Sequence, residues 1–128
     1  MIFADSSFFV GLTDSRDQWH ARAASLLSSL PPDITVSDLI VAESVSIIGA
    51  RAGGKAAQHL YRYFRDSCEV EYVDRDVLAA SMDVHLKFDG RLSVADCTSI
   101  VIMSHRRISR VLSFDSDFDR VKGILRLS

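Results

Sequence analysis

The sequence predicts one α/β domain of three layers, in which helices cover both faces of a mostly parallel sheet of about five strands. Its short apolar runs are typical of buried strands, and helical patterns separate them along most of the chain. Strands that alternate with helices pair in parallel, because the chain crosses back over the sheet between them. The 128 residues contain no linker, internal repeat or low-complexity stretch, so a single domain is expected to span residues 1–128.

The first strand is expected at residues 2–4, where Ile2, Phe3 and Ala4 form a continuous apolar run. Such runs are typical of strands buried at the centre of a parallel sheet. Asp5 follows directly, at the point where the strand should end. Ligands of open α/β sheets bind in the crevice outside the carboxyl ends of the strands. The sequence therefore predicts that Asp5 faces a cleft.

Two helices are expected between this strand and the next. The first is short, from Ser6 to Leu12, and a polar turn after it ends it. In the second, Ser15 and Gln18 match a capping box, in which two side chains at a helix start satisfy backbone N–H groups. Its apolar side is expected to consist of Trp19, Ala23, Leu26, Leu27 and Leu30, and Pro31-Pro32 stops it.

The later elements follow from capping and turn residues. Ser37 is expected to cap a helix that ends at Gly53-Gly54, and a further helix is expected from about Lys55 to Asp66. Two more helices are expected, one capped by Asp74 or Asp76 and one opened by Ser93 after a loop at residues 87–92. The remaining strands are expected at residues 34–36, 69–73, 110–113 and 124–127.

Composition narrows the function classes. The net charge of −2 argues against binding nucleic acid through overall charge, although a local basic face is still compatible with it. Cys68 and Cys97 lack metal-ligand spacing and are expected to be reduced thiols. The apolar runs are far shorter than the roughly 20 residues of a membrane helix, and the N-terminus lacks the pattern of a signal peptide. These features predict a cytoplasmic protein.

Five acidic residues fall at junctions between the predicted strands and helices. Asp5 follows the first strand, and Glu43 lies one to two turns into the helix after the second. Asp96 lies in the first turn of a later helix, and Asp115 and Asp117 follow the fourth strand. Carboxylates that converge without Lys or Arg repel one another unless a divalent cation is bound. Ligands that are all oxygen atoms favour Mg²⁺ or Mn²⁺ over Zn²⁺.

Each of these acids also has a possible role that involves no metal. Asp5 can cap a helix, and Asp96 can complete a capping box with the serine three residues before it. Glu43 can be an ordinary exposed residue, while Asp115 and Asp117 are residues that turns favour. All of these roles would have to coincide at four separate junctions. Their joint placement is what favours a shared site.

Four short segments carry a resemblance to a known family. They are Phe3-Ala4-Asp5-Ser6-Ser7, Val41-Ala42-Glu43-Ser44, Ser93-Val94-Ala95-Asp96-Cys97 and Val111-Leu112-Ser113-Phe114-Asp115-Ser116-Asp117-Phe118. In order and spacing they resemble the PIN-domain ribonucleases, most closely the small VapC-type toxins of toxin–antitoxin pairs, over the whole chain. The resemblance implies that Asp5, Glu43, Asp96 and Asp115 are the acidic quartet of the family, with Asp117 as an additional acid.

The resemblance further implies an endoribonuclease that depends on Mg²⁺ or Mn²⁺ and hydrolyses phosphodiester bonds. Asp5, Asp96 and Asp115 are expected to bind the metal, with Glu43 and Asp117 completing the catalytic set. Ser113 replaces the Thr that the family often has, and its hydroxyl can still bond a metal-ligating carboxylate. The expected partners are an RNA substrate, an antitoxin that covers or enters the cleft, and a second copy of the chain in a homodimer.

Contacts to RNA must come from outside the acidic pocket, because a phosphate backbone attracts cations. Basic and aromatic side chains near the Glu43 helix are the candidates: Arg16, Arg51, Lys55, Arg62 and Arg65, with Tyr61 and Tyr63 for base stacking. An ordinary amphipathic helix surface or a dimer contact explains the same pattern.

Two other function classes fit the sequence less well. A phosphoacceptor domain also gathers acids at strand ends, but a receiver needs an acidic pair after the first strand and a Lys after a late one. A phosphatase of the Asp-x-Asp kind needs a second acid where Ser7 stands. A non-catalytic RNA-binding or scaffold module of the same fold is expected to have lost one or more acids. All of them are present here.

Overall fold

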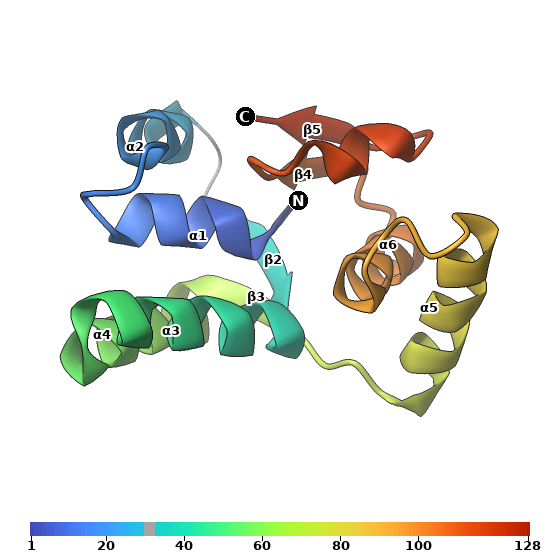
Figure 1. The fold of residues 1–128 in the computed structure, drawn as a ribbon, viewed down its shortest axis with the longest axis horizontal. Helices are drawn as coiled ribbons and strands as arrows, with labels where there is room; N and C mark the ends of the chain where they lie inside the picture. Colours follow the sequence, from blue (N-terminus) through green and yellow to red (C-terminus); the bar gives the residue numbers. More distant parts are fainter. Residues whose placement is uncertain (30–32) are drawn as a thin grey trace.

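The computed structural model describes residues 1–29 and 33–128, in which a five-stranded sheet lies between helices (Figure 1). The strands are β1 Ile2–Ala4, β2 Ile34–Ser37, β3 Cys68–Glu71, β4 Arg110–Leu112 and β5 Leu125–Leu127. The helices are α1 Ser6–Thr13, α2 His20–Ser29, α3 Asp38–Ala52, α4 Gly54–Ser67, α5 Arg75–Lys87 and α6 Val94–Arg106, with a 3₁₀ helix, η1, at Ser116–Arg120.

All strand pairs are parallel, in the order β3-β2-β1-β4-β5. The chain moves from β1 through β2 to β3 on one side and then returns to β4 and β5 on the other. Right-handed crossovers therefore place α1–α4 on one face and α5–α6 on the opposite face, and Figure 1 shows these two groups on the left and the right. The predicted three-layer domain with parallel strands is confirmed.

The carboxyl ends of β1 and β4 form the point where the chain direction across the sheet switches. In sheets of this kind, ligands bind at such a point because the connections leave the two neighbouring strands in opposite directions. β1 is fully buried, and the Asp5 N–H that follows it donates to the Leu112 carbonyl of β4 at 2.9 Å. The fold thus positions residues after β1 and after β4 beside one another.

Three of the predicted helix caps are present. The side chains of Ser37, Asp74 and Ser93 accept the N–H groups of residues 40, 77 and 96. The third cap directs the start of α6, and Asp96 with it, toward the carboxyl edge of the sheet. These caps rest on local chemistry, which is why the sequence predicts them well.

The predicted capping box at Ser15 is wrong, because α2 begins only at His20. The carboxylates of Asp14 and Asp17 accept the backbone N–H groups of Arg16 and Trp19, at 3.0 and 2.9 Å. These local bonds fold residues 14–19 into turns and leave no helix for Ser15 to cap. The expected roles of Leu30 and Pro31-Pro32 lie outside the described residues.

Smaller differences concern strand ends. β3 begins at Cys68 and ends at Glu71, not at Val73, because the Val73 N–H donates to the Asp38 carboxylate at 2.9 Å and not to a neighbouring strand. β4 ends before Ser113, and β5 begins at Leu125. Within the described ranges no helix has the length and apolar character needed to cross a membrane.

Candidate active site

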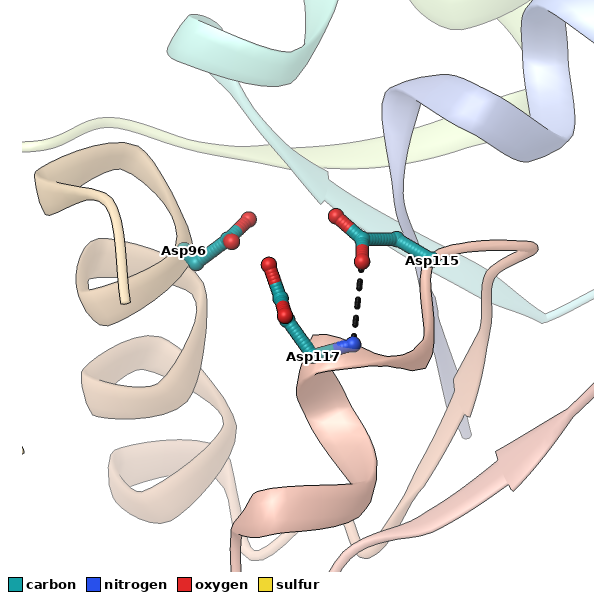
Figure 2. Close-up of side chains that lie close together, drawn as sticks. All are labelled: Asp96, Asp115 and Asp117. Carbon is teal, nitrogen blue, oxygen red and sulfur yellow. Dashed lines mark hydrogen bonds between the residues drawn. The ribbon is translucent and has the colours of Figure 1, made fainter. Parts of the chain in front are cut away.

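Three of the five predicted acids lie close together above the carboxyl ends of the strands (Figure 2). One carboxylate oxygen from each of Asp96, Asp115 and Asp117 lies within 4.8 Å of the other two. In residues 1–29 and 33–128 this is the one group of three or more potential metal-ligating side chains. The three carboxylates come from two elements that face each other, the first turn of α6 and the start of η1.

The turn after β4 brings Asp115 and Asp117 to the same side. Asp115 caps η1 with one oxygen, Oδ1, which accepts the Asp117 N–H at 2.9 Å. Ser113 in turn accepts the Asp115 N–H at 3.0 Å. The turn role considered for Asp115 is therefore real, and it also points this carboxylate and that of Asp117 at Asp96.

Asp5 is nearly buried at the end of β1, and two hydroxyl groups hold it. Ser113 and Ser7 both donate to its Oδ2 atom, at 3.0 and 3.1 Å. Ser7 also accepts the Phe114 N–H at 2.9 Å, which ties the start of α1 to the turn after β4. The side chain of Asp5 makes no capping bond to α1, so helix capping does not explain this residue.

The hydroxyl of Ser113 was expected to bond a carboxylate, and it does. The sequence predicts no role for Ser7, yet it contacts both Asp5 and the backbone of the opposite turn. A small hydroxyl residue two positions after an acid at a strand end was the one signal for this role. It is weak, because serine is equally common at any helix start.

Burial and neighbouring negative charges both raise the pKa values of Asp96 and Asp5. Burial is the main cause that raises the pKa of Asp96 to about 7, and the neighbouring Asp5 and Asp115 charges raise it further. Burial also raises the pKa of Asp5, with a contribution from Glu43, while hydrogen bonds from Ser113 and from residues 6–7 oppose the shift. Among the described residues, no Lys or Arg forms an ion pair with Asp5, Asp96 or Asp115, and Arg120 lies 3.6 Å from Asp117.

Glu43 lies on α3, exposed to solvent and outside the group of three carboxylates. Its charge acts on Asp5, so it lies at the margin of the same site. The structure thus gathers all five predicted acids in one region. It differs from the expected ligand set in detail, because Asp117 belongs to the tight group of three and Asp5 stands beside that group.

The donor set fits a hard divalent cation. Carboxylate oxygens are the ligands that Mg²⁺ and Mn²⁺ prefer, and neither His nor Cys belongs to the group. The uncompensated negative charge would be offset by such an ion. Burial is the main cause of the raised pKa of Asp96, and the same repulsion raises it further, because a bound proton removes one of the negative charges.

The metal-free protein is expected to lose stability as the pH rises from about 4 to about 7 through Asp96. Its folded pKa lies above the ordinary 3.8, so the folded state binds this proton more tightly than the unfolded chain. Unfolding then releases the proton, and higher pH favours unfolding. Thermal unfolding with EDTA should show Asp96→Asn to be more stable than wild type at about pH 8, by several °C, with a smaller difference at about pH 5. An equal difference at both pH values would contradict this.

Comparison with known proteins places this geometry in a family. A family model described as PIN domain matches residues 2–124. The chain is 30% identical over 120 residues to the 23S rRNA-specific endonuclease VapC20 of Mycobacterium tuberculosis, covering 92% of each sequence.

Solved structures agree with the sequence match. The crystal structure of Mycobacterium tuberculosis VapC20, described as a Sarcin-Ricin loop cleaving toxin, gives a TM-score of 0.86 at 28% identity over 94% of both chains. A toxin–antitoxin complex from Klebsiella pneumoniae gives a TM-score of 0.77 at 13% identity, over 98% of this chain and 96% of that one, and shows the fold alone. The chain therefore belongs to the PIN-domain family and is of the VapC type.

Proposed function

We propose that the protein is a divalent-metal-dependent endoribonuclease and the toxin of a toxin–antitoxin pair. The observation that carries this is the group formed by Asp96, Asp115 and Asp117, with Asp5 beside it and no basic partner for Asp5, Asp96 or Asp115 among the described residues. The curated relative is an rRNA endonuclease of nearly the same length. The alternative of a non-catalytic RNA-binding module lacks support, because each predicted acid is present at the site.

The proposed roles of the residues are those that the resemblance to the family implies. Asp5, Asp96 and Asp115 would hold Mg²⁺ or Mn²⁺, with Asp117 and Glu43 completing the set. A bound divalent ion supplies a Lewis acid for phosphate oxygens and lowers the pKa of water. Ser7 and Ser113 hold the Asp5 carboxylate in one orientation through its Oδ2 atom. The expected products are a 3′-hydroxyl and a 5′-phosphate.

The basic side chains that are predicted to contact RNA differ in whether they already form an ion pair. Arg16 and Arg51 are paired with Asp14 and Asp17, and Arg65 is paired with Asp66. Lys55 and Arg62 are exposed on α4 and form no ion pair with another described residue. These two side chains are therefore the stronger candidates for phosphate contacts.

The expected protein partners are an antitoxin and a second copy of the chain. Several of the structural neighbours are toxin–antitoxin complexes, which supports the first. Leu78, Met82 and Leu86 are exposed at four-residue spacing along α5, which supports the second. An antiparallel α5 pair centred on Met82 would place Leu78 against Leu86. Sedimentation velocity checks this pairing, and a monomer at micromolar concentration would contradict it.

The free thiols Cys68 and Cys97 support the cytoplasmic location.

The proposed function is tested by cleavage of a pool of structured RNAs. Wild-type protein with Mg²⁺ or Mn²⁺ should cut defined sites, and EDTA should stop the cleavage because the carboxylates alone cannot activate water. Gel mapping of the 5′ and 3′ ends identifies the products. Cleavage that continues in EDTA would contradict the proposal.

A further inference from the structure

A cavity of about 250 Å³ lies beside the acidic site, between α1, α3 and the connection from α1 to α2. This connection is at the far left of Figure 1. Residues 6–7 line one part of the cavity, Ile47 and Arg51 of α3 line another, and residues 17–19 line the rest. Ser7 is also a donor to the Asp5 carboxylate, so the cavity adjoins the proposed reaction site directly.

The indole of Trp19 forms an aromatic wall of this cavity. It stacks on the ring of Phe114, with the ring centroids 4.9 Å apart and an angle of 6° between the planes. Phe114 directly precedes Asp115 in the chain. A Cβ atom at Gly11 would lie 3.2 Å from the Trp19 Cβ, so the glycine allows this close approach. Trp19 nevertheless keeps 41% of its surface exposed, so Phe114 fixes the ring without covering it.

The charges around the cavity cancel. Nη1 of Arg51 lies 3.1 Å from Asp17 Oδ2 and 3.5 Å from Asp14 Oδ2, and Nε of Arg16 lies 3.2 Å from Asp14 Oδ1. Two positive and two negative groups leave little attraction for a phosphate, which seeks cations that are not already paired. Such a cavity suits a neutral, planar group that stacks on an aromatic ring.

The same wall offers polar groups for the edge of a planar ring. The side-chain amide of Gln18 is exposed and bonds no other described residue, and it has both donors and an acceptor. The guanidinium of Arg51 makes its ion pairs through Nη1, which leaves its other N–H donors without an acceptor among the described residues. An aromatic face beside amide and guanidinium groups is the chemistry that recognises unpaired nucleobases.

We propose that this cavity binds one unpaired base of the RNA substrate, stacked on Trp19, next to the phosphate that is cleaved. The inference rests on the proposed function and narrows its substrate to single-stranded or looped RNA. A base inside a duplex cannot present its face to the indole. Base stacking on an aromatic side chain tolerates any of the four bases, so the cavity selects unpaired nucleotides before it selects a sequence.

The test uses Trp19 itself, because it is the single tryptophan of the chain. Asp96→Asn protein with Mg²⁺, which is expected not to cut, is titrated with a fluorescein-labelled single-stranded RNA of about eight nucleotides. An abasic strand of the same length is titrated in parallel, since it keeps the phosphates and lacks the bases. Label anisotropy reports binding, and tryptophan emission reports stacking. The base-bearing RNA should quench Trp19, and the abasic strand should not.

Variants separate a binding role from a structural one. In otherwise wild-type protein, Trp19→Ala should raise KM for RNA cleavage about 10-fold and change kcat less than about 2-fold, and Trp19→Phe should restore most of the affinity. Tyr72 is a matched aromatic control, 71% exposed and lining another cavity. Tyr72→Ala protein should show the same quenching of Trp19 as its parent.

The outcomes are distinguishable. RNA binding without quenching, equal quenching by the abasic strand, or no RNA binding at all would overturn the proposal. So would a change in Trp19 emission that only a protein partner produces, because the cavity would then be a protein-binding site. If wild type cuts no RNA but the base-dependent quenching occurs, the proposed function fails and the base site stands. If wild type cuts RNA but the emission of Trp19 does not change, the proposed function stands and the base site fails.

Discussion

Asp96→Asn and Asp5→Asn are each expected to reduce metal-dependent RNA cleavage by at least about 100-fold, because changes one shell further from a metal already cost about 10- to 100-fold. Asp96 belongs to the tight group of carboxylates, and Asp5 is fixed beside it by two hydroxyls. Asparagine keeps the size of each side chain and removes its negative charge. Initial rates on one defined RNA, at saturating Mg²⁺, measure the loss.

The matched control for these variants is Asp83→Asn. Asp83 is exposed on α5 and forms no ion pair with another described residue. The Asp83→Asn substitution changes the net charge of the protein by the same amount. It should leave the cleavage rate within about 2-fold of wild type, because surface substitutions commonly have small effects. Equal activity in all four proteins would show that the cleavage comes from a contaminant or from another part of the molecule.

Phe9→Ala is expected to lower the free energy of unfolding by about 3–5 kcal/mol. Phe9 is fully buried on α1 and packs edge-on against Phe64 of α4, with ring centroids 4.5 Å apart. The rings of Phe8 and Tyr63 lie 5.3 and 6.3 Å from it. Removing the ring leaves a cavity that these rigid neighbours cannot fill, so the cost includes lost contacts as well as lost burial.

Urea denaturation followed by circular dichroism measures this change. Leu125→Ala is the control, because Leu125 is 59% exposed on an edge strand, and it should shift stability by no more than about 0.5 kcal/mol. A loss below about 1 kcal/mol for Phe9→Ala would mean that the site collapses around the missing ring. The packing described for α1 and α4 would then be wrong.

The sequence predicts the sheet and most helix starts because those features depend on neighbouring residues. The apolar run at residues 2–4 and the caps at Ser37 and Ser93 each act within one turn or one strand. The segment at residues 14–19 is different. The predicted capping box competes with the hydrogen bonds that nearby backbone N–H groups donate to Asp14 and Asp17. Nothing in the sequence alone decides that competition.

The candidate site is predictable in its members and not in its internal arrangement. Strand ends and helix starts bring the five acids to one edge, which follows from the topology. The place of Asp117 in the tight group depends on the hydrogen bond that its N–H donates to Asp115. The bonding of Asp5 to two hydroxyls depends on the position of Ser7. The hydrogen bonds from Ser113 to Asp5 and between Ser7 and Ser113 join residues more than a hundred positions apart and appear only in the folded chain.

Calorimetric titration with Mn²⁺ tests most directly whether the acidic group is a metal site. Wild-type protein should bind Mn²⁺ with a saturable isotherm, and Asp96→Asn should bind it at least about 10-fold more weakly, since the variant removes a negative ligand from the group. Asp83→Asn should match wild type. Saturable binding that is equal in all three proteins, or no binding to wild type, would contradict the account.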